Sequence, residues 1–319
     1  MRQERGGEWM TWGRDRGCGL WVDGRSWQGV TYLRICSTRW LHPRGALTTF
    51  RALAPRPSRE DELSCMKQLL RKALRSVGFD IIRVSEGDES AYSDFTDEDR
   101  ALIARIRPFT MTSRERIFAL RAAVRYVVEN QIPGDFVECG VWRGGSMMAI
   151  ALTLIEMGDT SRDLHLFDTF EGMPPPKAVD QRFDGVPAQD MLDHRPKTTE
   201  DAYWAIAPID DVRRNVLSTG YPESKIHFVK GLVEETIPGS APARIALMRL
   251  DTDWYDSTKH EFEHLYDRVS PEGAIIIDDY GWWSGSKKAA DEFIATRKFK
   301  PLLQRIDRGG RLVLKPPQG

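Results

Sequence analysis

Short apolar runs alternate with amphipathic segments over most of the chain after residue 112. The runs are rich in Ile, Leu, Val and Phe and are too short for buried helices, which is typical of strands covered on both faces. Strands that alternate with helices in this way build a parallel sheet. We therefore expect an α/β fold whose strands are DFVECG at 135–140, LHLFD at 164–168, KIHFVKG at 225–231, IALMRLD at 245–251 and AIIIDD at 274–279.

The segments between these strands have helical spacing. In residues 112–131, apolar side chains recur every three or four positions, and Thr112 precedes Glu115 by the spacing of a capping box. We expect one helix to begin there and another to begin at Ser257, capped by Asp256. Further helices are expected at 146–158, 210–220 and 286–298, and a closing hairpin at 302–306 and 311–315.

Three parts of the chain are distinguished by their pattern. Residues 1–65 hold five of the ten tryptophans and no lysine, without sustained periodicity, and we expect a disordered extension or a natural start at Met66. Residues 66–108 are expected to form a helical lead-in, and residues 109–319 the main domain. Within that domain, residues 174–208 are polar and contain prolines, as a lid or binding loop does.

The composition argues against several classes of partner. The chain has 319 residues, a net charge of -1 and a pI of about 6.6, so no basic excess indicates nucleic acid or an anionic membrane. No apolar run reaches the ~18 residues of a membrane span. The four cysteines form no CxxC pair. These features favour a reduced, cytoplasmic protein.

A glycine-rich turn, ECGVWRGG at 138–145, follows the first expected strand. Glycines allow a ligand to approach the backbone, although Gly140 alone would also suit a simple tight turn. Asp168 ends the second strand, where an acid commonly binds the ribose hydroxyls of a nucleoside cofactor. Because the turn lacks G-x-G-x-x-G, the pattern favours S-adenosylmethionine over a nicotinamide cofactor.

Residues 260–264, HEFEH, match the H-E-x-x-H pattern of zinc proteases. At about 100° per residue, Phe262 falls on the apolar helix face, whereas His260 and His264 fall near the opposite pole. The sequence identifies no third ligand. We therefore expect the histidines to face solvent and the match to be fortuitous.

Carboxylates gather at the ends of the last two strands. Asp251 ends the fourth strand, and Asp278 and Asp279 end the fifth. Since ligands of open parallel sheets lie at the carboxyl ends of the strands, these acids should converge beside the glycine turn. Unpaired, they would repel one another, and a hard divalent cation such as Mg²⁺ would relieve this. The alternative is that Asp278 or Asp279 caps the following helix.

Several segments resemble those of the macrocin O-methyltransferase family, which includes aminocoumarin sugar O-methyltransferases. The likeness covers about residues 109–295 in order and spacing. It implies a class I, Rossmann-like methyltransferase with a seven-stranded, mostly parallel sheet and helices on both faces. The segments are TMTSRERIFAL, GDFVECGVWRGGSMMAIAL, DLHLFDTFEGMP, RLDTDWYDST and IIIDDYGWWSGSKKAADEF.

The resemblance also implies residue roles. Asp251, Asp278 and Asp279 match the Mg²⁺ ligands of the family, and Asp251 matches its proposed general base. Thr252 stands where members often have Gly. The positions that match cofactor-binding residues for S-adenosylmethionine are Thr112, Glu138, Cys139, Gly140, Val141, Gly145, Ser146, Asp168, Gly231 and Val233.

Three functions remain open at this point. The first is methyl transfer to a hydroxyl of a sugar or glycosylated natural product, which the resemblance implies, with a homo-oligomeric enzyme. The second is a catechol-type O-methyltransferase that uses the same acids, and the third is a methyltransferase-like binding protein without turnover. Aromatic side chains near the site either stack on an acceptor or pack internally; they are Tyr203, Trp204, Trp282 and Trp283.

Overall fold

The structure, a computed structural model, describes residues 92–317 together with the short pieces 9–10, 20–21, 25–27 and 30–32. The chain divides into two units, Met1–Ser85 and Glu86–Gly319. The helix expected from Met66 and most of residues 1–65 lie outside the described residues.

Four short strands are described in the first unit. They form two separate antiparallel pairs, β1 with β2 and β3 with β4. Their bounds are Trp9–Met10 (β1), Leu20–Trp21 (β2), Arg25–Trp27 (β3) and Val30–Tyr32 (β4).

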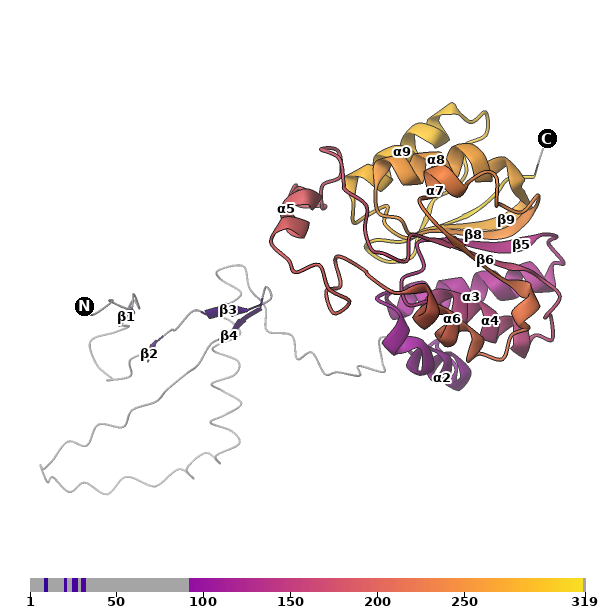
Figure 1. Ribbon diagram of the computed structural model, residues 1–319, viewed down its shortest axis with the longest axis horizontal. Helices are drawn as coiled ribbons and strands as arrows, with labels where there is room; N and C mark the ends of the chain where they lie inside the picture. The colour runs from indigo at the N-terminus through magenta and orange to yellow at the C-terminus, as the bar shows by residue number, and fades with distance from the viewer. Residues whose placement is uncertain (1–8, 11–19, 22–24, 28–29, 33–91, 318–319) are drawn as a thin grey trace, which may run out of the picture. The chain divides into compact units, whose positions relative to one another are not determined.

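A seven-stranded sheet forms the centre of the second unit, in the order β10-β11-β9-β8-β5-β6-β7 (Figure 1). The strands from β9 to β7 in this order are parallel, whereas β11 and β10 pair antiparallel at one edge. All five expected strands and the closing hairpin are therefore confirmed. The strands are β5 (Asp135–Cys139), β6 (Leu164–Asp168), β7 (Ile226–Lys230), β8 (Ile245–Leu250), β9 (Val269–Ile277), β10 (Gln304–Arg305) and β11 (Arg311–Leu314).

Helices cover both faces of this sheet. Phe136 of β5 packs into a core shared with α3 and α4, whereas its neighbour Val137 packs with side chains of α8 and α9, because successive strand residues point to opposite faces. Figure 1 shows α2, α3, α4 and α6 on one face and α7, α8 and α9 on the other. The expected mostly parallel α/β sheet is thus confirmed. The helices are α2 (Asp97–Ile106), α3 (Arg114–Glu129), α4 (Gly145–Glu156), α5 (Ala188–Asp193), α6 (Ile209–Leu217), α7 (Val233–Thr236), α8 (Tyr255–Leu265) and α9 (Ser284–Thr296), with short 3-10 turns at η2 (Arg107–Phe109), η3 (Glu223–Lys225) and η4 (Tyr266–Arg268).

Two expected helix caps are wrong. Ser113, not Thr112, caps α3, because its hydroxyl accepts a hydrogen bond from Arg116 N at 3.2 Å. The Thr112 hydroxyl is engaged elsewhere, by Arg249. At α8 the helix begins at Tyr255 after Trp254, and Asp256 lies inside its first turn, paired with Lys177.

The expected lid segment, residues 174–208, contains the helix α5, which its sequence does not indicate. The segment is fastened to the main domain at its first part. Trp254 Nε1 donates to Pro174 O at 2.9 Å, and the buried carboxylate of Asp180 accepts from Tyr255 N at 2.8 Å. Ser284 Oγ donates to Val179 O at 2.6 Å. The segment is therefore held against the N-terminal ends of α8 and α9.

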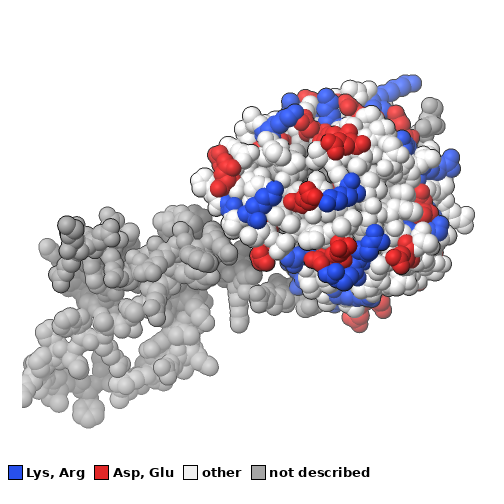
Figure 2. All heavy atoms as spheres, in the orientation of Figure 1, with Lys and Arg blue, Asp and Glu red and all other residues white. Residues whose placement is uncertain are grey.

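The surface of the second unit carries charges of both signs. On the face shown in Figure 2, acidic and basic side chains are intermingled without a large field of one sign. Among the described residues, no helix has both the length and the apolar character that a membrane crossing requires.

Candidate active site

A cavity of about 380 Å³ lies at the carboxyl ends of the parallel strands. Residues that follow β5, β6, β7, β8 and β9 line it, together with residues from the start, middle and end of the lid segment. This is the edge at which open α/β sheets bind their ligands. Most of the residues that the sequence singles out meet here: Thr112, Gly140, Val141, Gly145, Ser146, Asp168, Gly231, Val233, Asp251, Asp278 and Asp279.

The glycine turn is shaped by close backbone approach. Gly140 has φ +78°, and a Cβ at this position would overlap the carbonyl oxygen of Asp251. A side chain on Gly145 would collide with the backbone of Phe109. Gly140 therefore lets the ends of β5 and β8 come together, and Gly145 lets the start of α4 approach η2. Both glycines line the cavity.

Asp168 fastens this turn to β6. Its Oδ2 accepts hydrogen bonds from Val141 N at 2.7 Å and Trp142 N at 3.1 Å, and its Oδ1 accepts from Phe170 N at 2.6 Å. Burial raises the pKa of Asp168 more than these hydrogen bonds lower it. The side chain lines the cavity while both its oxygens hold the surrounding loops in place.

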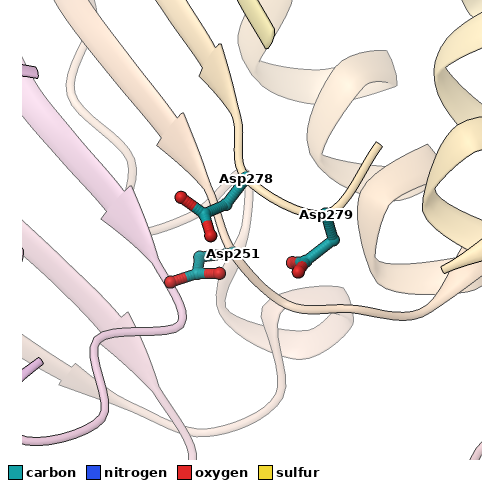
Figure 3. Close-up of side chains that lie close together, drawn as sticks. All are labelled: Asp251, Asp278 and Asp279. Atoms are coloured by element: carbon teal, nitrogen blue, oxygen red, sulfur yellow. The ribbon is translucent and has the colours of Figure 1, made fainter. Parts of the chain in front are cut away.

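Asp251, Asp278 and Asp279 form a compact carboxylate cluster (Figure 3). One oxygen from each lies within 4.8 Å of the others. Burial and neighbouring acids raise the pKa of Asp251 to about 6 and raise that of Asp279 well above its usual range. Asp279 Oδ2 is buried and has no hydrogen-bond partner among the described residues. Neither acid caps α9, whose first residue follows Trp283 without a side-chain cap.

Two of the three acids, Asp251 and Asp278, are paired with arginines, which corrects the expectation from the sequence. Arg249 Nη1 lies 2.7 Å from Asp251 Oδ2 and also pairs with Glu138, and its Nη2 donates to Asp278 Oδ1 at 2.6 Å. Arg116 pairs with Asp278 from the other side. Burial alone would raise the pKa of Asp278, but the two guanidinium groups outweigh it and the pKa is lowered. Arg249 could have been identified in the sequence, because it is a basic residue inside the apolar run IALMRLD.

Two predicted cofactor residues lie outside the cavity lining. Glu138 is fully buried beneath the turn, paired with Arg249, and burial raises its pKa to about 7. Cys139 points into the opposite core, among side chains of α8 and α9. The contacts of Glu138 give it a part in holding Arg249 rather than a place on the cavity wall.

Asp253 is a cavity residue that the sequence reasoning missed. It lines the cavity two residues after Asp251, with a backbone φ of +66°. Burial and the charge of Asp251 raise its pKa to about 8. Its place in the D-T-D sequence, at the same strand end as Asp251, is the signal that could have identified it.

The zinc interpretation is not supported. His264 is exposed as expected, whereas His260 is half-buried, with its Nε2 2.9 Å from the carbonyl oxygen of Ile237. The two rings are tilted against each other, and neither lines the cavity. Within the described part of the chain, the one His, Cys, Asp and Glu group suited to a metal is Asp251, Asp278 and Asp279. The glutamate of the motif, Glu261, points the other way, into the interior.

Aromatic side chains also line the cavity. Trp283 is buried and packs edge-on against Trp254 at 5.0 Å between ring centroids. Trp282 and Tyr203 line the cavity, whereas Trp204 packs within the lid segment behind them. Of the aromatics that the sequence singles out, Trp282 and Tyr203 are thus half-buried side chains that face the cavity.

Comparisons with known proteins give the family. The family model of macrocin O-methyltransferase (TylF) matches residues 57–313. The chain belongs to this family. It is accordingly an S-adenosylmethionine-dependent O-methyltransferase with a class I, Rossmann-like fold.

Several relatives are similar over most of their length. The 8-demethyl-8-(2,3-dimethoxy-alpha-L-rhamnosyl)-tetracenomycin-C 4'-O-methyltransferase of Streptomyces olivaceus is 34% identical, over 69% of this chain and 81% of the relative. Demethyldecarbamoylnovobiocin O-methyltransferase of Streptomyces niveus is 32% identical, over 63% and 73%. The solved structure of the O-methyltransferase NovP is 31% identical and covers 65% of this chain and 82% of its own, with a TM-score of 0.57.

Proposed function

We propose that this macrocin-type enzyme methylates a hydroxyl of a sugar carried by a glycosylated small molecule, with the help of a divalent cation. The single observation that carries the proposal is the cavity, which joins the glycine turn to the carboxylate cluster. The names of two relatives support the acceptor class, since one acts on a rhamnosyl tetracenomycin and another is a mycinamicin III 3''-O-methyltransferase from Micromonospora griseorubida.

The residues on one side of the cavity fit S-adenosylmethionine, which supplies an electrophilic methyl group when it is bound. The turn from Gly140 to Gly145 lines the cavity, and its two glycines allow the close backbone packing that sets its shape. Asp168 fixes the shape of the turn through Val141 and Trp142. Further residues that would contact the cofactor are Thr112, Ser146, Gly231 and Val233.

The carboxylate cluster fits a divalent cation. Its donors are all oxygens, and the buried Asp279 Oδ2 is unsatisfied in the described structure. Asp251, Asp278 and Asp279 would hold Mg²⁺ or a similar ion, as hard oxygen ligands do. A bound divalent ion lowers the pKa of an adjacent hydroxyl and orients it.

The proton of the acceptor needs a base, for which the sequence predicts Asp251. Arg249 Nη1 lies 2.7 Å from the Asp251 carboxylate and stabilises its charged form, so Asp251 suits the role of a ligand better. No ion pair joins Asp253 to a Lys or Arg within the described residues, and it lines the same cavity. We therefore propose that a carboxylate oxygen of Asp253 accepts the proton of the acceptor hydroxyl, with Asp251 as the alternative.

Orientation supplies much of the remaining rate enhancement, because a reacting pair held at about 3 Å loses little further entropy. Trp282 and Tyr203 would support one face of the acceptor sugar. The lid segment, docked through Asp180 and Ser284, lines the cavity and would limit the access of water.

Methyl transfer from isotopically labelled S-adenosylmethionine to a panel of glycosides and catechols tests this function. We expect label on a sugar hydroxyl, lost with EDTA and restored by Mg²⁺. Label on catechols alone would support the aromatic-diol alternative. Cofactor binding without transfer to any acceptor of either class would support a binding protein.

A further inference from the structure

Glu261 is a buried acid for which methyl transfer has no obvious use. It lies in α8 with no exposed surface, about 100° around the helix from His260. Burying a carboxyl group is costly unless hydrogen bonds compensate for the lost water. Its Oε2 has no hydrogen-bond partner among the described residues, so the compensation must come from Oε1.

Oε1 accepts a hydrogen bond from the hydroxyl of Thr252 at 2.9 Å. Thr252 separates Asp251, a proposed metal ligand, from Asp253, the proposed base. Burial raises the pKa of Glu261 well above its usual range and so favours its neutral form. The hydrogen bond between Thr252 and Glu261 therefore links α8 to the loop that carries Asp251 and Asp253.

That loop is strained and needs an anchor. Trp254 N donates to Thr252 O at 2.7 Å, a bond between residues two apart that closes a γ-turn centred on Asp253. Asp253 has φ +66°, the left-handed region that side chains other than glycine rarely adopt. Such a conformation persists only where its surroundings fix it. The bond from Thr252 to Glu261 is a side-chain anchor at the first residue of this turn.

We propose that Glu261 is a positioning residue that, through the Thr252 hydroxyl, holds the γ-turn presenting Asp253 to the cavity. The inference rests on the proposed function for its catalytic meaning. Thr252 supplies the hydroxyl on which the anchor depends.

Amide hydrogen exchange of the full chain, free of metal and cofactor, tests the anchor. Peptides that cover residues 251–254 are compared with peptides from β5 as an internal reference. We expect Thr252→Val to speed exchange in the loop by about five-fold, the effect of one lost hydrogen bond, without a change in β5. Glu261→Met should have at least the same effect, and the double variant should exchange no faster than the faster single variant.

Two matched variants separate positioning from general destabilisation. Glu261→Gln keeps an uncharged acceptor at Oε1, and we expect loop exchange to stay within about two-fold of wild type. Glu263→Gln, on the exposed side of the same helix, should change nothing. Thr252→Val keeps the test decisive if Glu261→Met does not fold.

Unchanged loop exchange in Thr252→Val would overturn the inference, as would equal acceleration of the loop and β5. Loss of the anchor in Glu261→Gln to the same extent as in Glu261→Met would also overturn it. Because this readout uses protein without metal or cofactor, its outcome does not depend on whether Asp253 is the base. That assignment fails separately, if Asp253→Asn retains full turnover.

Discussion

The guanidinium of Arg249 lies among the carboxylates of Glu138, Asp251 and Asp278 and is almost inaccessible to solvent, with 2% of its side chain exposed. Arg249 lies in β8. Its guanidinium links Glu138, beneath the glycine turn, to Asp251 and Asp278 of the carboxylate cluster. Arg249 Nη2 also donates a hydrogen bond to the Thr112 hydroxyl at 3.0 Å, and so engages the hydroxyl that was expected to cap α3. At the scale of single residues, Arg249 fixes the geometry of the proposed metal ligands.

Replacing Arg249 by methionine should destabilise the fold by about 3–5 kcal/mol, because it leaves buried carboxylates without their partner. Urea unfolding at neutral pH measures the change. Arg213→Met, at an exposed position of α6, is the control and should stay within about 0.5 kcal/mol of wild type. A fully stable Arg249→Met protein would mean that the buried acids are protonated and need no cation.

Asp251 and Asp253 are expected to respond differently to substitution. Asp253→Asn should lower kcat by about 10²-fold or more, the loss typical of a general base, while divalent-ion affinity changes little. Asp251→Asn should abolish divalent-ion binding. Steady-state kinetics and titration with Mn²⁺ separate the two. If Asp253→Asn keeps kcat and Asp251→Asn keeps the metal, the assignments are reversed.

At the scale of elements, loops between helices and strands bring the site together. The loop before β11 reaches the first turn of α3, where Asp307 Oδ2 accepts from Ser113 Oγ at 2.7 Å and from Arg116 Nε at 2.9 Å. Its Oδ1 accepts from Gly309 N and Gly310 N. Arg116 in turn pairs with Asp278, so the hairpin supports one proposed metal ligand indirectly.

The contribution of Asp307 to stability should depend on pH. Burial would raise its pKa, but hydrogen bonds from Gly310 N and Ser113 and the charge of Arg116 outweigh burial, and the pKa is lowered. The stabilisation is thus complete above the ordinary value of 3.8 and is lost as the pH falls through the lower value of the folded state. Asp307→Asn should cost about 2 kcal/mol at pH 7 and pH 5 alike, and less at pH 3.5.

Urea unfolding at these three pH values measures the difference. Asp267→Asn is the control, because that side chain is 80% exposed and its variant should show no such trend. An Asp307→Asn deficit that grows toward acid pH would contradict the proposed ionisation.

The lid segment depends on Asp180. Its Oδ1 accepts from Tyr255 N and its Oδ2 from Lys177 N, and Gly285 leaves the space that its carboxylate fills. Asp180→Ala should release the segment, so trypsin should cleave after Arg182 and Lys197 several-fold faster than in wild type. Asp193→Ala, exposed in α5, is the matched control. Unchanged cleavage would show that the segment is held by other contacts.

The elements were largely predictable from sequence, and the contacts of the site only in part. Apolar runs such as IALMRLD identify buried strands because burial on both faces constrains every residue, and strand-end acids are placed by the topology of a parallel sheet. The pairing of Arg249 depends on partners far apart in sequence. Whether Thr112 or Ser113 caps α3 depends on Arg249, which engages one of the two hydroxyls.

The burial of the Glu261 side chain was also not predicted from the sequence. The H-E-x-x-H match draws attention to the two histidines, whereas Glu261, about 100° around the helix from His260, is the fully buried residue of the motif. The φ of +66° at Asp253 has no counterpart in the sequence pattern, because it follows from how the loop is anchored.

At the scale of the whole molecule, the second unit is a methyltransferase domain in which one edge of the sheet carries the chemistry. The helices that cover both faces leave the carboxyl ends of the strands open, and the lid segment lies beside that opening (Figure 1). The central claim is that this one cavity takes both S-adenosylmethionine and a divalent cation, the latter at Asp251, Asp278 and Asp279.

Calorimetric titration with S-adenosylmethionine, followed by Mg²⁺, tests this claim most directly, on wild type and on a variant that carries both Asp278→Asn and Asp279→Asn. The account predicts that both proteins bind the cofactor and that wild type alone takes up the metal ion. Cofactor binding by wild type with no uptake of any divalent ion would contradict it, because the carboxylate cluster would then serve another purpose.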